Sequence, residues 1–257
     1  MVTSDMIEPE LKLAKAPIVE AVLDIDCDMP PAFEVSALER PAREAFKAAY
    51  PKFRSQFLEQ HRFEAKPDEP STHSTRRGIQ AFRFLHDDEK QLVQVRAQGF
   101  SFNRLAPYTS LDDYLPEIQR TWELFRGIAS PNKVLVIRLR YINRFLIPFT
   151  DGKLLLGDYI KNSPQLPENS NLIFAGFLNQ HLAIEVGTGH EANIILTGQP
   201  PENEKLPIIF DNCVAGTGPV MPEDWPWILQ KILSLRDLKN RIFKNTLTPQ
   251  CLNLFQQ

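Results

Sequence analysis

The sequence predicts an α+β fold in which antiparallel strands are backed by long helices. Apolar and polar residues alternate in several runs, which is the period of a β-strand. Two longer segments carry apolar residues three and four positions apart, which is the period of an amphipathic helix. The predicted elements also occur in the order β-α-β-β-β-α twice, over residues 1–132 and 133–257.

The first unit opens on PIVEAVLDIDCDM, in which apolar positions alternate with Asp24, Asp26 and Asp28. A helix is predicted over residues 35–49, followed by a short strand at 53–65 and a polar, proline-bearing loop at 65–77. Residues 78–86 and 90–105 read as a hairpin, with a break at Gly99. A helix then follows at 109–129, and Ser110 with Asp113 resembles a capping box at its start.

The second unit opens on the strand VLVIRLRYINRFLIP, residues 134–148. A short helical piece is expected at 157–163, and three strands at 172–187, 190–199 and 206–216. The longest predicted helix covers residues 222–247, and Glu223 and Asp224 suit the positive end of its dipole. The two units predict either two sheets or one saddle-like sheet. This topology resembles that of the TATA-binding protein, a comparison that carries no function.

Composition narrows the class of protein. The chain has 257 residues, enough for one large or two ordinary domains, and its 43% hydrophobic content supports a packed core. No apolar run reaches the ~18 to 20 residues of a membrane helix, so no membrane partner is predicted. The N-terminus lacks an apolar signal region, and Cys27, Cys213 and Cys251 form no CxxC pair. A cytoplasmic location follows as the expectation.

Catalytic and metal motifs are missing from the sequence. No phosphate-binding glycine loop, HExxH or GxSxG motif occurs, and no cofactor is predicted. His181 and Glu185 lie ~13 Å apart along a strand, so only His190, folding back from a turn, could approach one of them. The three aspartates of the first strand are ~6.5 to 7 Å apart, too far for an oxygen cage. The sequence therefore predicts no metal site.

The strand at 134–148 is the most distinctive feature because its arginines share one parity. One face is expected to carry Val134, Val136 and the arginines Arg138, Arg140 and Arg144, and the other face Leu135, Leu139 and Tyr141. If the strands pair in register, Arg96 and Arg104 of the hairpin are expected on the same face as the arginines of the strand, with Phe100 and Phe102 among these arginines. The candidate binding residues are Arg96, Asn103, Arg104, Arg138, Arg140, Tyr141, Asn143 and Arg144.

Two interpretations of this arginine face stay open. Asp24, Asp26 and Asp28 have the spacing to neutralise the arginines across strands, as a structural ladder. Alternatively, arginines beside aromatic rings form a surface for single-stranded nucleic acid or an anionic ligand. The net charge of -3 ranks nucleic acid second among the predicted partners.

Four stretches together resemble a sporadically distributed family of uncharacterised prokaryotic proteins. They are KAPIVEAVLDI, FSFNRLAPYTSLDDYLPEIQRTWELF, IRLRYINRFLIP and LKNRIFKNTLTP, and FSFNRL and RYINR are the most specific parts. The region 152–218 carries no part of the likeness. The resemblance implies a soluble prokaryotic protein and no particular activity. A patchy distribution is typical of mobile accessory genes, such as defence or toxin–antitoxin modules.

Three functions follow as hypotheses. The first is a non-catalytic binding protein with a protein partner, such as an accessory or neutralising component of a defence module, with a homodimer as a further expectation. The second is a nucleic-acid-binding protein that uses the arginine face. The third is an enzyme with an unrecognised site between the two halves, for which Arg140, Tyr141, Asn143 and His181 are the best candidates.

Overall fold

The protein, described by a computed structural model over residues 13–31, 33–66, 69–150, 152–167, 172 and 175–256, has the predicted α+β class. Its described strands form one antiparallel nine-stranded sheet in the order β2-β3-β4-β5-β1-β6-β9-β8-β7. Among the helices of these residues, none combines the length and apolar character needed to cross a lipid bilayer.

The elements follow one another in two series, each of which ends in a long helix. The first series is β1 (Ile18–Asp28), the 3-10 turn η1 (Val35–Leu38), α1 (Glu39–Phe46), β2 (Lys52–Lys66), β3 (Glu69–Leu85), β4 (Gln91–Arg96), β5 (Gly99–Leu105) and α2 (Leu111–Ala129). The second is β6 (Lys133–Pro148), the 3-10 turn η2 (Leu156–Asp158), β7 (Phe177–Ile184), β8 (Glu191–Gly198), β9 (Lys205–Val220) and α3 (Trp225–Thr246), after which comes α4 (Pro249–Asn253).

The first strand of each series lies at the centre of the sheet. β1 and β6 pair antiparallel, with Leu23 opposite Leu139 and Asp24 opposite Arg138. Outward from this pair, the first series continues as β5, β4, β3 and β2, and the second as β9, β8 and β7. The division predicted between residues 132 and 133 thus falls between α2 and β6, inside one continuous sheet.

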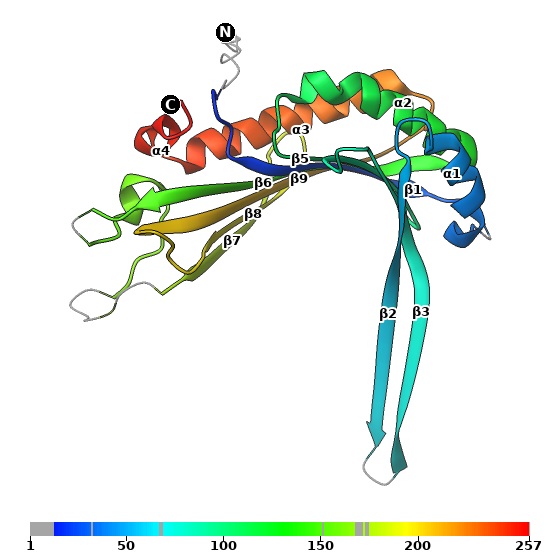
Figure 1. Ribbon diagram of the computed structural model, residues 1–257, viewed down its shortest axis with the longest axis horizontal. Helices are drawn as coiled ribbons and strands as arrows, with labels where there is room; N and C mark the ends of the chain where they lie inside the picture. Colours follow the sequence, from blue (N-terminus) through cyan, green and yellow to red (C-terminus); the bar gives the residue numbers. More distant parts are fainter. Residues whose placement is uncertain are drawn as a thin grey trace.

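All four α-helices lie over the same face of the sheet, and the other face is left uncovered (Figure 1). Trp122 and Phe125 of α2 pack on Phe100 of β5, with ring centroids 5.8 and 5.7 Å from it. Phe243 of α3 stacks on Phe210 of β9 at 5.6 Å. Each such buried aromatic or aliphatic side chain stabilises the fold by about 1.5 to 3 kcal/mol. The core therefore occupies the layer between helices and sheet.

The start of α2 confirms its predicted cap. Ser110 has an extended backbone, and its Oγ accepts a hydrogen bond from the amide of Asp113 at 3.2 Å. This bond satisfies one of the amides that a helix start leaves without a partner. The helix therefore begins at Leu111, next to the end of β5.

The predicted faces of the central strand are confirmed except at its start. Ile137, Leu139 and Tyr141 are buried under the helices, as expected. A register shift between Val134 and Val136, however, reverses the alternation. Val134 is therefore buried and Leu135 is exposed, the opposite of the prediction. An irregularity of one residue exchanges the two faces because the side-chain period of a strand is two.

The prediction of a loop at residues 65–77 is wrong, apart from Pro67 and Asp68, which lie outside the described residues. β2 and β3 pair from Lys52–Leu85 out to Lys66–Glu69, so β3 extends into the predicted loop, whereas the strand predicted at 53–65 is confirmed as β2. Figure 1 shows this pair as a two-stranded ribbon that extends away from the helices. A ribbon without a covering layer needs no apolar face, so its polar composition resembles that of a loop.

Two helix predictions also need correction. The segment predicted as a helix over residues 35–49 starts as the 3-10 turn η1, and α1 ends at Phe46. Helix α4, which Thr248 caps by accepting from the amide of Cys251 at 3.2 Å, was not predicted because its five residues are too few to show a period.

Candidate functional site

The structure distributes the eight candidate residues over both faces of the sheet. The uncovered face carries Arg96, Asn103, Arg138, Arg140 and Arg144, whereas Arg104, Tyr141 and Asn143 lie on the helix-covered face. Arg104 is separated from Arg96 because a tight turn at Ala97 and Gln98 joins β4 to β5, with Arg96 opposite Gly99. The break predicted near Gly99 is thus confirmed as a turn between two strands, and it reverses the parity by which Arg96 and Arg104 were placed on one face.

The expected mixture of arginines and phenylalanines is therefore wrong. Phe100 and Phe102 are buried under α2, on the face opposite to Arg96 and Arg138. The guanidinium of Arg104 lies 5.3 Å from the ring centroid of Tyr114 and 3.7 Å from the carboxylate of Asp88. No arginine of the uncovered face stands beside those two rings, so the stacking platform expected for nucleic acid is absent there.

Asp26 joins two of the arginines on the uncovered face. It forms an ion pair with Arg138 of the neighbouring strand β6. It also accepts a hydrogen bond from Arg96 Nη2 at 2.8 Å, across the position of Gly99 in β5. Asp24 accepts a hydrogen bond from the hydroxyl of Ser101. The predicted ladder is thus confirmed for Asp26 and Arg138.

Arg140 and Arg144 have carboxylate partners outside β1. Arg140 bonds both oxygens of Asp211 on β9, with Nε 2.8 Å from Oδ1, and Arg144 Nη2 lies 2.6 Å from Glu202. Asp211 raises the pKa of Arg140; burial opposes a rise in the pKa of Arg138, but Asp26 outweighs it. The aspartates of β1 were expected to be the carboxylate partners of these arginines, but Asp211 and Glu202 come from the second half of the chain. Each arginine that β6 presents on the uncovered face is therefore neutralised by a carboxylate.

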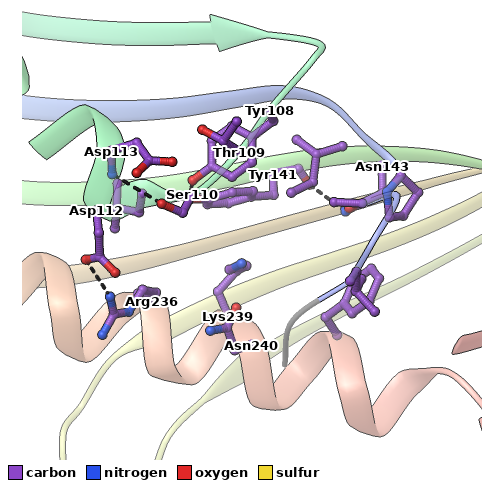
Figure 2. Close-up of a pocket in the computed structure, with 16 residues that line it drawn as sticks. Tyr108, Thr109, Ser110, Asp112, Asp113, Tyr141, Asn143, Arg236, Lys239 and Asn240 are labelled. Atoms are coloured by element: carbon purple, nitrogen blue, oxygen red, sulfur yellow. Dashed lines mark hydrogen bonds and ion pairs between the residues drawn. The ribbon is translucent and has the colours of Figure 1, made fainter. Parts of the chain in front are cut away.

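The helix-covered face contains a cavity of about 430 Å³, and its floor holds two of the candidate residues, Tyr141 and Asn143. Figure 2 shows it between the start of α2 and the second half of α3. The side chains of Arg236, Lys239 and Asn240 come from α3, and Ser110 from the start of α2. The segment from Leu13 to Ile18 forms the remaining apolar wall.

A pair of tyrosines marks one side of this cavity. The hydroxyls of Tyr108 and Tyr141 lie 2.7 Å apart in a hydrogen bond. The ammonium of Lys239 stands 3.8 Å from the ring centroid of Tyr141, a cation–π contact. Burial raises the pKa of Tyr141 to about 12, and burial also raises that of Tyr108. Both phenols are therefore protonated at neutral pH and act as neutral hydrogen-bonding groups.

The other polar groups of the cavity are held in place by bonds to neighbouring elements. Asn143 donates a hydrogen bond to the carbonyl of Phe210 at 3.0 Å. Arg236 donates to Asp112 of α2 at 3.0 Å, so an ion pair joins the two helices at the cavity rim. The cavity thus offers fixed polar groups of both charges beside an apolar wall, an arrangement suited to binding a small polar molecule.

The residues that α3 contributes were missed in the sequence. Arg236, Lys239 and Asn240 occupy positions i, i+3 and i+4, which place three side chains on one face of a helix. They interrupt the apolar stripe between Leu235 and Phe243. These three polar residues beside the apolar stripe of the predicted helix were the sequence feature that could have indicated a polar site there. Arg140 and His181, the other residues suggested for an enzyme site between the halves, do not line this cavity.

The predicted approach of His190 to Glu185 is confirmed, with Nδ1 3.6 Å from Oε2. Thr188 and Arg241 also bond Glu185, and His181 lies on β7 beside Asn179 and Arg241 in a separate hollow. Among the residues that the structure describes, no group of three or more histidine, cysteine or acidic side chains is placed to hold a metal ion.

A scan against protein-family models and searches of curated proteins and of solved structures gave no match to this chain.

Proposed function

We propose that the protein is a non-catalytic interaction protein that binds a protein partner through the ribbon formed by β2 and β3. Its role would be that of an accessory or neutralising component of a prokaryotic defence or toxin–antitoxin type module, as the family resemblance suggests. The observation that carries the binding proposal is the length of the ribbon beyond the sheet.

From the Phe57–Ile79 pair outward to Lys66–Glu69, no other described strand pairs with β2 or β3. A two-stranded ribbon in water is only marginally stable because it buries little apolar surface. Phe57 and Leu58, which point to opposite sides at its base, are both exposed, and Arg77 covers the ring of Phe57 at 4.1 Å. A projecting ribbon with exposed apolar groups gains stability when a partner covers it.

The proposal is tested by removing the ribbon while the sheet is kept. Leu58–Gly78 is excised, and Phe57 is joined to Ile79 through Asn-Gly, a sequence favoured in two-residue hairpin turns. The core residues Phe53, Phe82 and Phe84 are retained, so cooperative thermal unfolding is expected to persist. Affinity capture from the native host with the intact chain should recover a protein that the shortened chain does not.

A control variant, Met221→Lys, changes an exposed side chain far from the ribbon in the sequence and should recover the same protein as the intact chain. Equal recovery by the shortened chain, or recovery of the bait alone, would count against the proposal.

The cavity between α2 and α3 supports a second candidate function, the binding or conversion of a small polar molecule. A volume of about 430 Å³ suits a metabolite-sized ligand. Mass spectrometry of the protein isolated from its host under non-denaturing conditions should then show an added mass. Asn240→Trp, which fills the cavity, should remove that mass, whereas Gln230→Trp at an exposed position of the same helix should keep it. Equal masses in both variants would contradict this function.

We further infer that the chain is a duplicated unit with a saddle-like sheet of the TATA-binding-protein type. The strands of the two series leave the central β1–β6 pair in the same sequence of neighbours, and each series ends in a helix on the same face. This order supports duplication because independent origins need not place equivalent strands at equivalent distances from the centre.

A further inference from the structure

The last strand of the sheet, β7, presents an apolar strip to solvent. Its even-numbered side chains lie on the uncovered face, because the odd-numbered Asn179 and His181 line a hollow on the helix side. Three of these four side chains are large and apolar: Leu178, Leu182 and Ile184 are 69%, 78% and 70% exposed, whereas the fourth, Gln180, is polar and exposed. Large apolar groups at such exposure and in such a row mark a surface that another chain covers.

The two edges of the sheet differ in their protection. The opposite edge, β2, carries the exposed charged residues Lys52, Arg54 and Glu59. Charged side chains of this kind discourage the pairing of an edge with a second chain. The segment FLNQHLAI of β7 has no formal charge and no proline, and β8 is its only partner among the described strands. The β7 edge thus lacks the features that prevent strand addition.

We propose that a second copy of this chain pairs with β7, so that two sheets join edge to edge about a two-fold axis. With Leu182 at the axis of an antiparallel pair, Gln180 of each copy faces Ile184 of the other, on the same side of the joined sheet. The strip is continuous with Thr197 of β8, opposite Leu178, and with Ile209 of β9. Leu182 and Ile184 of both copies therefore form the apolar part of the contact, with Gln180 beside Ile184 on each side of the axis.

The charges near this edge agree with a symmetric contact. In a symmetric pair of strands, a charged residue near the axis would lie close to the same charge in the other copy. The eight residues of β7 include no Asp, Glu, Lys or Arg, so no such repulsion arises. The nearest charge, Glu185, is already bonded by Arg241 of the same chain at 2.5 Å; burial opposes a fall in the pKa of its carboxyl, but the hydrogen bonds from Thr188 and Arg241 lower it. A dimer of this form uses a surface separate from the ribbon, and it would carry two ribbons to a partner.

The first test is sedimentation equilibrium of the intact chain over a concentration series to 100 µM, taken as roughly the upper range for a specific weak dimer. The chain is expected to dimerise, and Leu182→Lys should raise the dissociation constant at least about tenfold. Leu182 is exposed in the single chain, so at concentrations where both proteins are monomeric the variant should unfold at the temperature of the intact chain. The control Met221→Lys adds the same charge at another exposed apolar site and should leave the dimer intact.

The second test locates the axis. Leu182→Cys should form a disulfide between two copies on mild oxidation, because residues opposed at a two-fold axis of paired strands meet at disulfide distance. Met221→Cys should not cross-link. A monomer at the highest concentration, a dimer indifferent to Leu182→Lys, or equal cross-linking at both positions would each overturn the proposal. The ribbon proposal would stand in every one of these cases, since its own test needs no dimer.

Discussion

Arg140 on β6 and Asp211 on β9 form a two-pronged ion pair, in which Nε and Nη2 of the guanidinium each bond one carboxylate oxygen. Asp211 is not directly opposite Arg140; that position belongs to Cys213, and the pair is diagonal. The strand that the sequence marks as most basic is thereby tied to its neighbour in the second half.

A double-mutant cycle with Arg140→Met and Asp211→Asn should give a coupling energy of about 0.5 to 1 kcal/mol. The Arg140 side chain is 45% exposed, which limits the gain through solvent screening, but Asp211 is only 13% exposed. The coupling should shrink in ~1 M salt. The pair Arg43–Glu39, exposed on both sides, is the control and should couple by less. Equal coupling in the two pairs, measured by urea unfolding, would contradict this expectation.

Gly99 should not tolerate a side chain. Its φ is +143°, and a Cβ would lie 2.2 Å from the carbonyl oxygen of Ile25. Gly99→Ala should therefore lower the free energy of unfolding by at least ~2 kcal/mol. Gly78→Ala is the matched control, since a Cβ there meets nothing within 4 Å, and it should change stability by less than ~1 kcal/mol. Denaturant unfolding of both variants measures the contrast, and equal losses would contradict it.

The hydroxyls of Tyr108 and Tyr141 should depend on each other. Tyr141→Phe keeps the ring under Lys239 but deprives the Tyr108 hydroxyl of its 2.7 Å partner, at a cost of about 1 to 2 kcal/mol. Adding Tyr108→Phe removes the unsatisfied group, so the double variant should lose less than the sum of the single variants. Urea unfolding of the four proteins measures this. Strict additivity would show that the pair contributes nothing.

His190 should make the protein less stable in mild acid. Burial, and then the positive charge of Lys231, lower its pKa below the ordinary value, although Glu185 opposes the shift. The unfolded chain therefore binds the proton more readily. The stabilising contribution is present above pH ~6.5 and is lost as the pH falls below it, by at most about 1.4 kcal/mol per unit.

The measurement is the free energy of unfolding at several pH values between 7.5 and 5. His190→Gln should flatten this pH dependence, whereas His181→Gln, at an exposed position, should leave it as in the intact chain. An unchanged slope in His190→Gln would refute the assignment.

The sequence predicted the central strands and long helices correctly because a buried face imposes a strict period. Leu23, Ile25 and Leu139 all lie where alternation placed them. One strand of the ribbon was predicted at 53–65, but the outer part of β3 was not, because its polar sequence has no apolar pattern that distinguishes it from a loop. Local irregularities were harder to predict: the shift at Val134 left no mark in the sequence, and the break near Gly99 was expected, but the reversal of faces that its turn causes was not.

The candidate site shows a similar division. Tyr141 and Asn143 were selected for their strand and do line the cavity, yet the side chains that complete it come from α3, about a hundred residues later. Their meeting depends on how α3 crosses the sheet. Ion-pair partners such as Asp211 and Glu202 were also assigned to the wrong strand, because one sequence does not reveal which strand becomes the neighbour of another.

The central place of β1 has a consequence for the order of folding during synthesis. Its two neighbours come much later in the chain: Ser101 of β5 follows its partner Asp24 by 77 residues, and Arg138 of β6 follows Asp26 by 112. One long edge of β1 therefore stays open on the ribosome until β6 has emerged. A nascent chain that stalls before β6 would present that edge to other nascent chains and to chaperones.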